Sequence, residues 1–167
     1  GLVTPRILEI LENIAKERGI SLFGDLQCSS QIGSIAKFRD YDLLCPTERE
    51  ARIGIGNHND SIEYVANALM NQCRAKNLIM KLGADGFIAY GKDDDEFVHR
   101  QYFPALTPNP VDVAGAGDSV LATMALGMTR GLSLMESAAL ACCVASLAVQ
   151  TVGNLPIKIS RVSELIN

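Results

Sequence analysis

Stretches with helical periodicity alternate with short apolar runs along this chain, and the alternation restricts the folds it can adopt. Apolar residues recur at helical spacing behind Thr4 and Pro5, which suit the N-cap and first position of a helix, up to Gly19. Apolar runs of strand length follow at 20–24, 41–45 and 78–82. Strands separated by helices favour a mainly parallel sheet with helices packed against it. We therefore predict an α/β fold.

The rest of the chain adds a hairpin and two apolar helices. Runs at 87–90 and 97–103, joined by a polar turn, predict antiparallel strands within the mainly parallel sheet. Helices are predicted at 118–130 and 134–152, after a brief strand at 111–113. Helices are also predicted from residue 48 and at 60–76, and the stretch at 157–166 is predicted to pack back. One face of the helix at 60–76 is apolar and is formed by Ile62, Val65, Ala66, Leu69, Met70 and Cys73. We interpret residues 1–167 as a single domain.

Composition excludes several functional classes. Apolar residues make up 48% of the 167, which is enough for a core, and 15 basic against 19 acidic residues leave a net charge of −4. A nucleic-acid partner is disfavoured, because duplex affinity depends on Lys and Arg side chains that neutralise phosphates. A membrane partner is disfavoured as well, because Arg130, Glu136 and Gln150 interrupt the apolar stretch at 120–152.

The cysteines and histidines form no metal-binding pattern. The five cysteines lack CxxC spacing, and His58 and His99 lie far apart in the sequence. Cysteines whose spacing forms no disulfide framework indicate buried, reduced thiols and a cytoplasmic protein. The acidic residues at 93–96 could suggest a metal site, but we favour a solvated hairpin turn.

The segment 112–118, which reads Asp-Val-Ala-Gly-Ala-Gly-Asp, carries the strongest chemical signal. Ligands of α/β sheets bind beyond the carboxyl ends of strands, where this segment is predicted to lie. Small residues let the backbone approach a ligand, and N–H groups at a helix start attract anions such as phosphate. Asp118 is placed to take a proton from a hydroxyl group held beside a phosphoryl group. The alternative is a tight turn whose carboxylate only complements the helix dipole.

Two other phosphate-binding motifs do not fit. A dinucleotide fingerprint would need Gly or Ala at position 120, which is Val120, and no GxxxxGK[ST] pattern occurs. A dinucleotide-dependent oxidoreductase is therefore disfavoured.

The segment 112–118 resembles the signature of the ribokinase-like (PfkB-type) carbohydrate kinases, Asp-Thr/Val-x-Gly-Ala-Gly-Asp. With Ser119 and Val120 after it, the variant is most similar to the kinase module of heptose-phosphate kinase/ADP-heptose synthase proteins. Similar stretches recur in the same order at 46–50, 81–86, 138–150 and 152–153. The resemblance implies the C-terminal, ATP-side half of a ribokinase-like fold. It also implies ATP-dependent phosphorylation of a sugar or sugar-phosphate hydroxyl, with the heptose-phosphate type favoured.

The resemblance further implies roles for individual residues. Asp118 corresponds to the base that deprotonates the sugar hydroxyl, and the N–H groups of Gly115, Ala116 and Gly117 correspond to the anion hole. Glu50 corresponds to a carboxylate that acts on Mg²⁺ through water, near the ATP phosphates. Further nucleotide-side candidates are Gly83, Gly86 and Cys142, and weaker candidates are Asp25, Asp112 and Thr47.

Some positions depart from the family pattern. Thr47 stands where the family has the Asn of Asn-x-x-Glu, and Cys142 stands where an Asn often lies near the adenine. At 26–27, Leu-Gln replaces Pro-Lys. Thr47 and Glu50 also fit a capping box, so Glu50 is open to a purely structural interpretation. The alternative function is a non-catalytic nucleotide-binding or interaction module that kept the kinase fold.

The extent of the resemblance carries its own expectations. The family's sugar pocket and lid lie in the half without a counterpart here, so we predict that this chain alone is inactive or weakly active. Gly rather than Met at position 1 suggests a piece of a longer protein or a processed chain. Apolar edges left uncovered would favour a homo-oligomer or a covering N-terminal segment.

Overall fold

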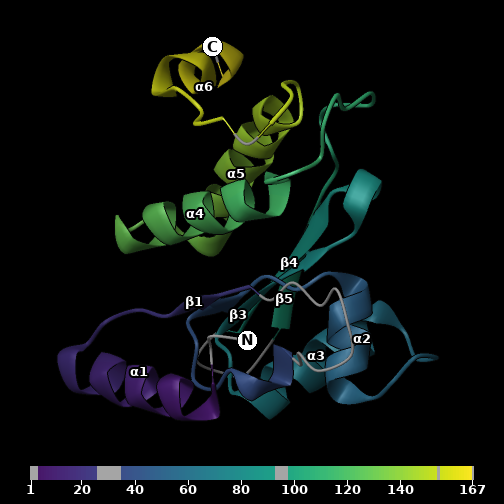
Figure 1. The fold of residues 1–167 in the computed structure, drawn as a ribbon. Coiled ribbons are helices and arrows are strands. Elements are labelled where there is room, and N and C mark those ends of the chain that lie inside the picture. Colours follow the sequence, from purple (N-terminus) through teal and green to yellow (C-terminus); the bar gives the residue numbers. More distant parts are fainter. Residues whose placement is uncertain (1–3, 26–34, 93–97, 154, 167) are drawn as a thin grey trace. The chain divides into compact units, whose positions relative to one another are not determined.

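The structure, a computed structural model, describes residues 4–25, 35–92, 98–153 and 155–166 (Figure 1). The chain forms two compact units, the first of Gly1–Met80 and Tyr90–His99 and the second of Lys81–Ala89 and Arg100–Asn167. The single domain that we predict over 1–167 stays a prediction.

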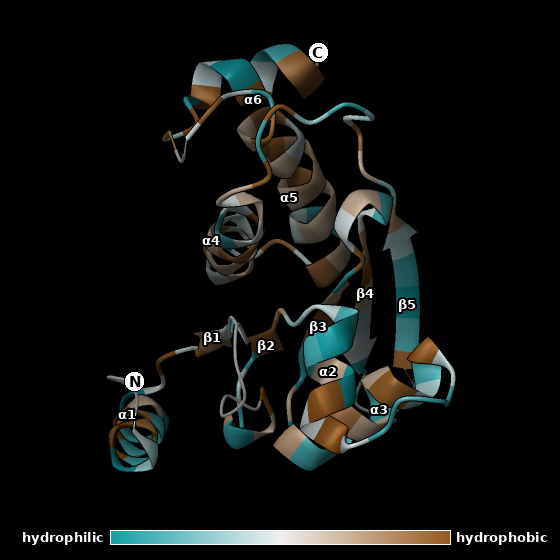
Figure 2. Cartoon of the chain, turned by 45° about the vertical axis from the view of Figure 1, so that its right-hand side comes forward, coloured by the Kyte–Doolittle hydropathy of each residue, from teal (hydrophilic) through white to brown (hydrophobic). Residues whose placement is uncertain are grey.

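The described strands form one five-stranded sheet in the order β1-β2-β3-β4-β5. They are β1 (Phe23–Gly24), β2 (Leu43–Leu44), β3 (Asn77–Lys81), β4 (Phe87–Lys92) and β5 (Val98–Phe103). The first three pair in parallel, with Phe23 opposite Leu43 and Leu43 opposite Asn77. The arrows of β4 and β5 run in opposite directions (Figure 2), as predicted for a hairpin. The predicted α/β class is confirmed.

Strands β1 and β2 are shorter than the predicted runs at 20–24 and 41–45. The ladder continues only as isolated bonds, in which the Asp42 N–H donates to the Leu22 carbonyl and the Cys45 N–H to the Gly24 carbonyl. Pro46 follows directly and has no N–H to donate, which interrupts β2, and Thr47 beyond it forms only an isolated bridge.

The first unit contains α1 (Pro5–Arg18), the 3₁₀ turn η1 (Ile35–Lys37), α2 (Glu48–Ile55) and α3 (Ile62–Cys73). Helix α1 has the ends that its capping residues predict. The Thr4 hydroxyl accepts a hydrogen bond from the Ile7 N–H at 3.3 Å, and Gly19 closes the helix at a left-handed φ of 63°.

Helix α3 buries the face that its periodicity predicts. It packs against α2 and η1. The buried residues of this face are Val65, Ala66, Leu69, Met70 and Cys73. Burial raises the pKa of the Cys73 thiol to about 11, so this thiol stays protonated and serves as an apolar core group.

Helix α1, by contrast, leaves an apolar stripe in contact with solvent. Its exposed members, each 39–48% accessible, are Ile7, Ile10, Leu11 and Ile14. Leu8 and Ala15, on the adjoining side of the helix, are buried. Only part of the apolar surface of α1 is therefore packed, and its brown segments are visible in Figure 2.

The second unit contains the turn η2 (Gly83–Asp85), α4 (Ala116–Thr129), α5 (Leu134–Ala148) and α6 (Ile159–Ile166). Helices α4 and α5 pack against each other, and α6 packs on α5 (Figure 1). Gly127 of α4 lies so close to α5 that a β-carbon there would be 2.7 Å from Ser137 Oγ. The close approach explains why a residue without a side chain stands at this position.

Three predictions in the second unit are wrong. Residues 111–113 form no strand, because the N–H groups of Val111 and Asp112 both donate to the Val149 carbonyl. Helix α4 starts at Ala116 instead of residue 118, because Gly115 supplies a left-handed N-cap with φ of 78°. Helix α5 also ends at Ala148 rather than at residue 152.

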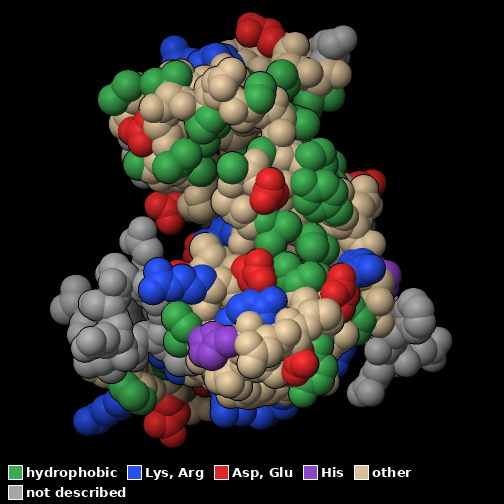
Figure 3. Space-filling view, turned by 90° about the vertical axis from the view of Figure 1, so that its right-hand side faces the viewer, with side chains coloured by type: hydrophobic (Ala, Val, Ile, Leu, Met, Phe, Trp, Pro, Cys, Tyr) green, Lys and Arg blue, Asp and Glu red, His purple; other side chains and the backbone are tan. Residues whose placement is uncertain are grey.

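Other predictions concern thiols and surfaces. Cys45, Cys73 and Cys142 are buried thiols, as predicted, whereas Cys143 is half-buried. No helix among the described residues is long and apolar enough to cross a membrane. Apolar side chains do reach the surface, and Figure 3 shows them in green on the face it presents. The acidic run at 93–96 and the dipeptide at 26–27 lie outside the described residues.

Candidate functional site

The start of α4 presents backbone N–H groups without partners. Gly115 adopts the left-handed conformation that glycine tolerates, and α4 begins at the next residue. The Ala116 N–H donates to the Val113 carbonyl at 3.3 Å, so this amide of the predicted anion hole is already engaged. For the N–H groups of Gly115, Gly117 and Asp118, no acceptor occurs in the described part of the chain. Amides at a helix start carry partial positive charge and suit an anion.

Asp118 lies in the first turn of α4 and is exposed to solvent. Its carboxylate has no hydrogen bond or ion pair with any described residue. An exposed carboxylate can accept a proton, whereas a buried or paired one would be held by the protein. The role of Asp118 as the base that deprotonates a sugar hydroxyl stays a prediction.

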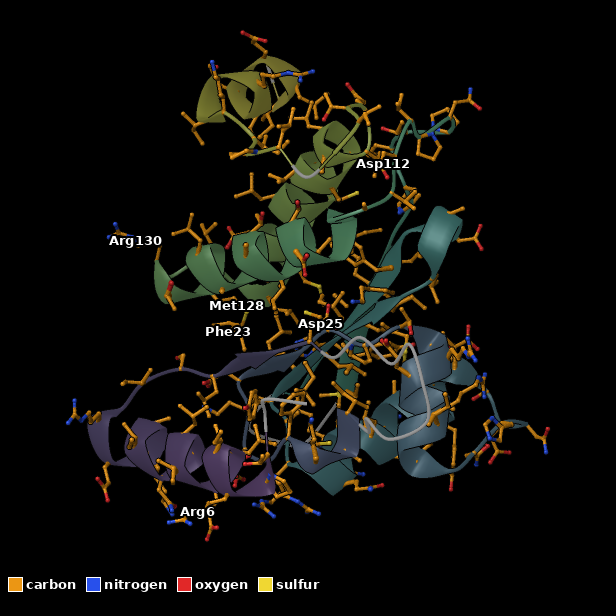
Figure 4. The ribbon with its side chains drawn as sticks, viewed as in Figure 1. Arg6, Phe23, Asp25, Asp112, Met128 and Arg130 are labelled. Atoms are coloured by element: carbon orange, nitrogen blue, oxygen red, sulfur yellow. The ribbon has the colours of Figure 1, made fainter. Side chains whose placement is uncertain are left out.

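Asp112 joins the segment before α4 to the segment after α5. Its Oδ1 accepts a hydrogen bond from the Ala114 N–H at 2.9 Å, and its Oδ2 accepts one from the Gly153 N–H at 3.0 Å. These bonds, first that from Ala114, lower the pKa of the Asp112 carboxyl, so it stays ionised. Figure 4 labels Asp112 on the segment that leads into α4.

Further bonds attach the 104–112 loop to α5. The Cys142 thiol donates to the Pro104 carbonyl with Sγ and O 3.1 Å apart. Burial, and then the neighbouring Cys143, raise the pKa of Cys142, so it remains a thiol that can donate. Cys142 therefore fixes the loop in this structure, and its predicted place near an adenine stays a prediction.

The turn at 83–86 shows why its two glycines differ. A β-carbon on Gly86 would lie 2.1 Å from the Phe103 carbonyl oxygen, so the neighbouring strand requires glycine there. Gly83 has a left-handed φ of 66° with open space around it. The Tyr102 hydroxyl donates to the Asp85 carbonyl at 2.6 Å and holds the turn to β5. Only Gly83 thus offers backbone that a nucleotide could approach freely.

In the first unit, Thr47 and Glu50 form a complete capping box at the start of α2. The Thr47 N–H donates to Glu50 Oε2 at 2.8 Å, and the Glu50 N–H donates to the Thr47 hydroxyl at 3.2 Å. Glu50 is buried, with 8% of its surface exposed. The structural interpretation of Glu50 is thus present in the fold, and a role toward Mg²⁺ stays a prediction. Asp25 directly follows β1 and is half-buried (Figure 4).

The described residues contain no group of three or more His, Cys, Asp or Glu side chains that could hold a metal ion. A single carboxylate is still compatible with Mg²⁺, which keeps several waters and takes oxygens from substrate phosphates. Glu50 therefore fits Mg²⁺ as one contact, directly or through water, and not as part of a protein cage.

The structure brings together Asp112, Ala114 and Gly153, and, separately, Thr47 and Glu50. The partnership of Asp112 with Gly153 was missed from the sequence, because residues 41 positions apart share no periodicity that would pair them. The only available signal was the likeness at 152–153 to the family's adenine-side region.

Comparison with known proteins identifies the family. The sequence pattern of the pfkB family of carbohydrate kinases matches residues 3–158, nearly the whole chain. This chain belongs to the pfkB family. Among curated relatives of this pfkB-family chain, the bifunctional protein HldE of Trichlorobacter lovleyi is 31% identical over 156 residues. HldE of Syntrophotalea carbinolica is 28% identical over 167 residues.

Solved structures show the same fold. The ribokinase of Arabidopsis thaliana, complexed with ribose and ATP, superposes with a TM-score of 0.79 at 25% identity. Phosphofructokinase-2 of Escherichia coli, in complex with potassium, gives 0.78 at 20% identity. The pfkB-family chain is covered to 98% in both, but it spans only 53% and 52% of those chains. It spans 30% and 32% of the two HldE proteins.

Proposed function

We propose that this chain supplies the nucleotide site, the anion-binding amides and the base of a carbohydrate kinase. The reaction is transfer of the γ-phosphoryl group of ATP to a hydroxyl of a sugar or sugar phosphate, of the heptose-phosphate type. Membership of the pfkB family, the HldE relatives and the ATP-bound ribokinase support this proposal.

The start of α4 would carry the chemistry. Asp118 takes the proton from the attacking sugar hydroxyl, which makes the oxygen a stronger nucleophile. The free N–H groups of Gly115 and Gly117 stabilise the negative charge of the phosphoryl group during transfer. When bound, Mg²⁺ neutralises charge on the phosphates, and Glu50 is the residue we assign to hold it through water.

The single observation that carries the proposal is the coincidence at one helix end of unengaged amides and an exposed, unpaired carboxylate. Helices α1, α2, α3 and α5 each have a side chain that caps their N–H groups, whereas α4 has none. The alternative, a nucleotide-binding module without catalysis, shares the amides but has no use for Asp118.

Titration calorimetry of this chain with MgATP, with and without a sugar phosphate, tests the proposal. We expect MgATP to bind and Asp118→Asn to bind it with unchanged affinity, because the base contacts the hydroxyl and not the nucleotide. In a full-length version, Asp118→Asn should abolish phosphorylation. Absence of MgATP binding, or preferential binding of NAD, would contradict the proposal. Nucleotide binding without phosphorylation in the full-length protein would favour the module, and full phosphorylation by Asp118→Asn would contradict the role of Asp118 as the base.

A further inference from the structure

We infer that Tyr102 is a positioning residue for the nucleotide, because its hydroxyl holds the turn at 83–86 in one place beside β5. The inference rests on the proposed function, since it concerns the nucleotide site that we assign to this chain. Tyr102 acts through the turn, and its side chain itself touches neither the nucleotide nor the sugar.

The turn at 83–86 lies beyond the carboxyl end of β3. That strand ends at Lys81 and runs parallel to β2. Ligands of such sheets bind beyond the carboxyl ends of the parallel strands. Gly83 has a left-handed φ of 66°, and no atom lies within 4 Å of the place of its missing β-carbon. The turn therefore lies at the edge of the sheet where a ligand is expected, and its backbone is open to approach.

The hydrogen bonds inside the turn set its shape but not its position. The Leu82 N–H donates to the Gly86 carbonyl at 2.8 Å, and the Gly86 N–H donates to the Gly83 carbonyl at 3.2 Å. The Asp85 N–H donates to the Leu82 carbonyl at 3.4 Å. Each of these bonds joins two residues of the segment 82–86, so all of them move with it. A contact from outside the segment is needed to fix the turn in place.

Strand β5 supplies such contacts on one side of the turn. Gly86 packs so closely on this strand that a β-carbon would lie 2.1 Å from the Phe103 carbonyl oxygen. Close packing of this kind prevents the turn from moving toward β5. The Tyr102 hydroxyl donates to the Asp85 carbonyl at 2.6 Å, and this hydrogen bond opposes movement away from β5. Together the two contacts leave the turn a single position.

The exposure of Tyr102 separates its hydroxyl from a role in the core. Tyr102 is 52% exposed, so its ring buries little apolar surface, whereas its hydroxyl has a defined partner. Phenylalanine at position 102 would therefore remove the hydrogen bond and change little else. Tyr64 of α3 is a matched control, because it is 54% exposed and its hydroxyl has no hydrogen-bond partner among the described residues.

Loss of this hydrogen bond would let the turn leave the position in which the nucleotide contacts it. The nucleotide would then bind only the fraction of molecules whose turn is in place, so the apparent affinity would fall with that fraction. A single neutral hydrogen bond changes such an equilibrium by about twofold to tenfold. The effect on MgATP affinity should therefore be modest.

The test compares Tyr102→Phe with Tyr64→Phe. We would measure MgATP affinity by calorimetry and hydrogen exchange at the amides of Asp85 and Gly86, which belong to the turn. For Tyr102→Phe we expect faster exchange at both amides and about fivefold weaker MgATP binding. Tyr64→Phe should leave both the exchange and the affinity unchanged.

Incorporation of 3-fluorotyrosine adds a readout that a general loss of stability would not move. This residue keeps the hydroxyl, so at position 102 it should preserve the wild-type affinity for MgATP. Its fluorine resonance should shift when MgATP is added, because the hydroxyl is bonded to the turn that the nucleotide contacts. The fluorine resonance of 3-fluorotyrosine at position 64 should stay unchanged.

The calorimetry separates failure of the inference from failure of the proposed function. If Tyr102→Phe bound MgATP as tightly as the wild type, the inference would be overturned while the proposed function stood. Equal weakening by Tyr64→Phe would also overturn it, because the effect would then not depend on the turn. If the wild type bound no MgATP, the proposed function would fail first, and the inference with it.

A second pair of variants tests the turn without changing Tyr102. Gly83→Ala and Gly19→Ala introduce the same left-handed strain, at φ of 66° and 63°, and neither introduces a clash. Gly19 ends α1 in the first unit. We expect Gly83→Ala to weaken MgATP binding and Gly19→Ala to leave it unchanged. Equal affinities of the two variants would overturn the inference, because the turn would then take no part in nucleotide binding.

Discussion

Three candidate carboxylates of this chain differ in what holds them. Asp118 is exposed and has no partner among the described residues, Asp112 accepts from two backbone N–H groups, and Glu50 closes a capping box. The free carboxylate is the one suited to exchange a proton with a substrate. The bonded pair are suited to hold backbone in place.

Glu50 has two candidate roles, and one substitution separates them. In Glu50→Gln the amide oxygen can still accept from the Thr47 N–H, so we expect a stability loss below about 1 kcal/mol. The lost charge should weaken MgATP binding and leave metal-free ATP binding nearly unchanged. Calorimetry with and without Mg²⁺ measures this.

The matched control for that prediction is Glu136→Gln, since Ser133 and Glu136 form a second capping box of the same kind. Glu136→Gln should leave the Mg²⁺ dependence of ATP binding unchanged. If Glu50→Gln and Glu136→Gln behaved alike in both assays, Glu50 would be only a helix cap.

The acid sensitivity of the first unit follows from two carboxylates, the exposed Asp40 and the half-buried Asp42. The hydrogen bond from Arg74 lowers the pKa of Asp40. Burial raises the pKa of Asp42, but hydrogen bonds from Lys76 and the Leu22 N–H outweigh it and hold this pKa below its usual value. A lowered pKa contributes stability that is present above the unfolded pKa and is lost as pH falls through the folded value.

We therefore expect the free energy of unfolding to fall as pH drops below about 4, the ordinary range of Asp. Urea denaturation at a series of pH values measures this, and Asp42→Asn should flatten the dependence. A free energy of unfolding that does not change with pH in the wild type would contradict the assignment of acid sensitivity to these two carboxylates. A pH dependence that is unchanged in Asp42→Asn would contradict it as well.

At the scale of elements, the packing of α4 on α5 depends on Gly127. Alanine there would gain about 1 kcal/mol from helix propensity, but its β-carbon would lie 2.7 Å from Ser137 Oγ. Overpacking costs about 1–3 kcal/mol, so we expect Gly127→Ala to be destabilising on balance. Chemical denaturation measures the difference.

Ser137 provides the second arm of that experiment. Its hydroxyl is fully buried and has no hydrogen-bond partner in the part of the chain that the structure describes. Ser137→Ala should therefore be neutral or stabilising, and it should recover part of the loss in the Gly127→Ala, Ser137→Ala double variant. Strict additivity of the two changes would show that the clash is not what destabilises Gly127→Ala.

The elements that the sequence predicts best are those whose ends and buried faces are determined by residues only a few positions apart. Thr4 and Gly19 cap α1 through contacts within a few residues, and the apolar periodicity of α3 predicts which of its faces is buried. The strand at 111–113 was wrong because a Val-x-Val pattern does not reveal that the Val111 N–H donates to Val149. Likewise, the sequence indicated the amides of 115–117 but not the long-range hydrogen bond from the Gly153 N–H to the nearby Asp112 carboxylate.

On the scale of the whole molecule, the chain spans about half of the solved kinase chains that it resembles. Phosphoryl transfer depends on holding both reactants in line. Because we expect the family's sugar pocket to lie in the half without a counterpart here, we expect this chain to bind ATP and to use it weakly or not at all. We predict that this chain shows no sugar-dependent release of ADP. Sugar-dependent release of ADP at ordinary kinase rates, measured in a coupled assay, would contradict that prediction.

The exposed stripe on α1 belongs to the same scale, because Ile7, Ile10, Leu11 and Ile14 offer contiguous apolar surface. The expected homo-oligomer, or a covering N-terminal segment, stays a prediction. Sedimentation velocity over a concentration series measures self-association directly.

The central claim is that the amides at the start of α4 receive a phosphate group, and amide NMR during a titration with MgATP tests it most directly. We expect the resonances of Gly115, Gly117 and Asp118 to shift and their exchange with solvent to slow, while those at the start of α5 stay unchanged. Binding of MgATP that leaves these three amides unperturbed would contradict the claim.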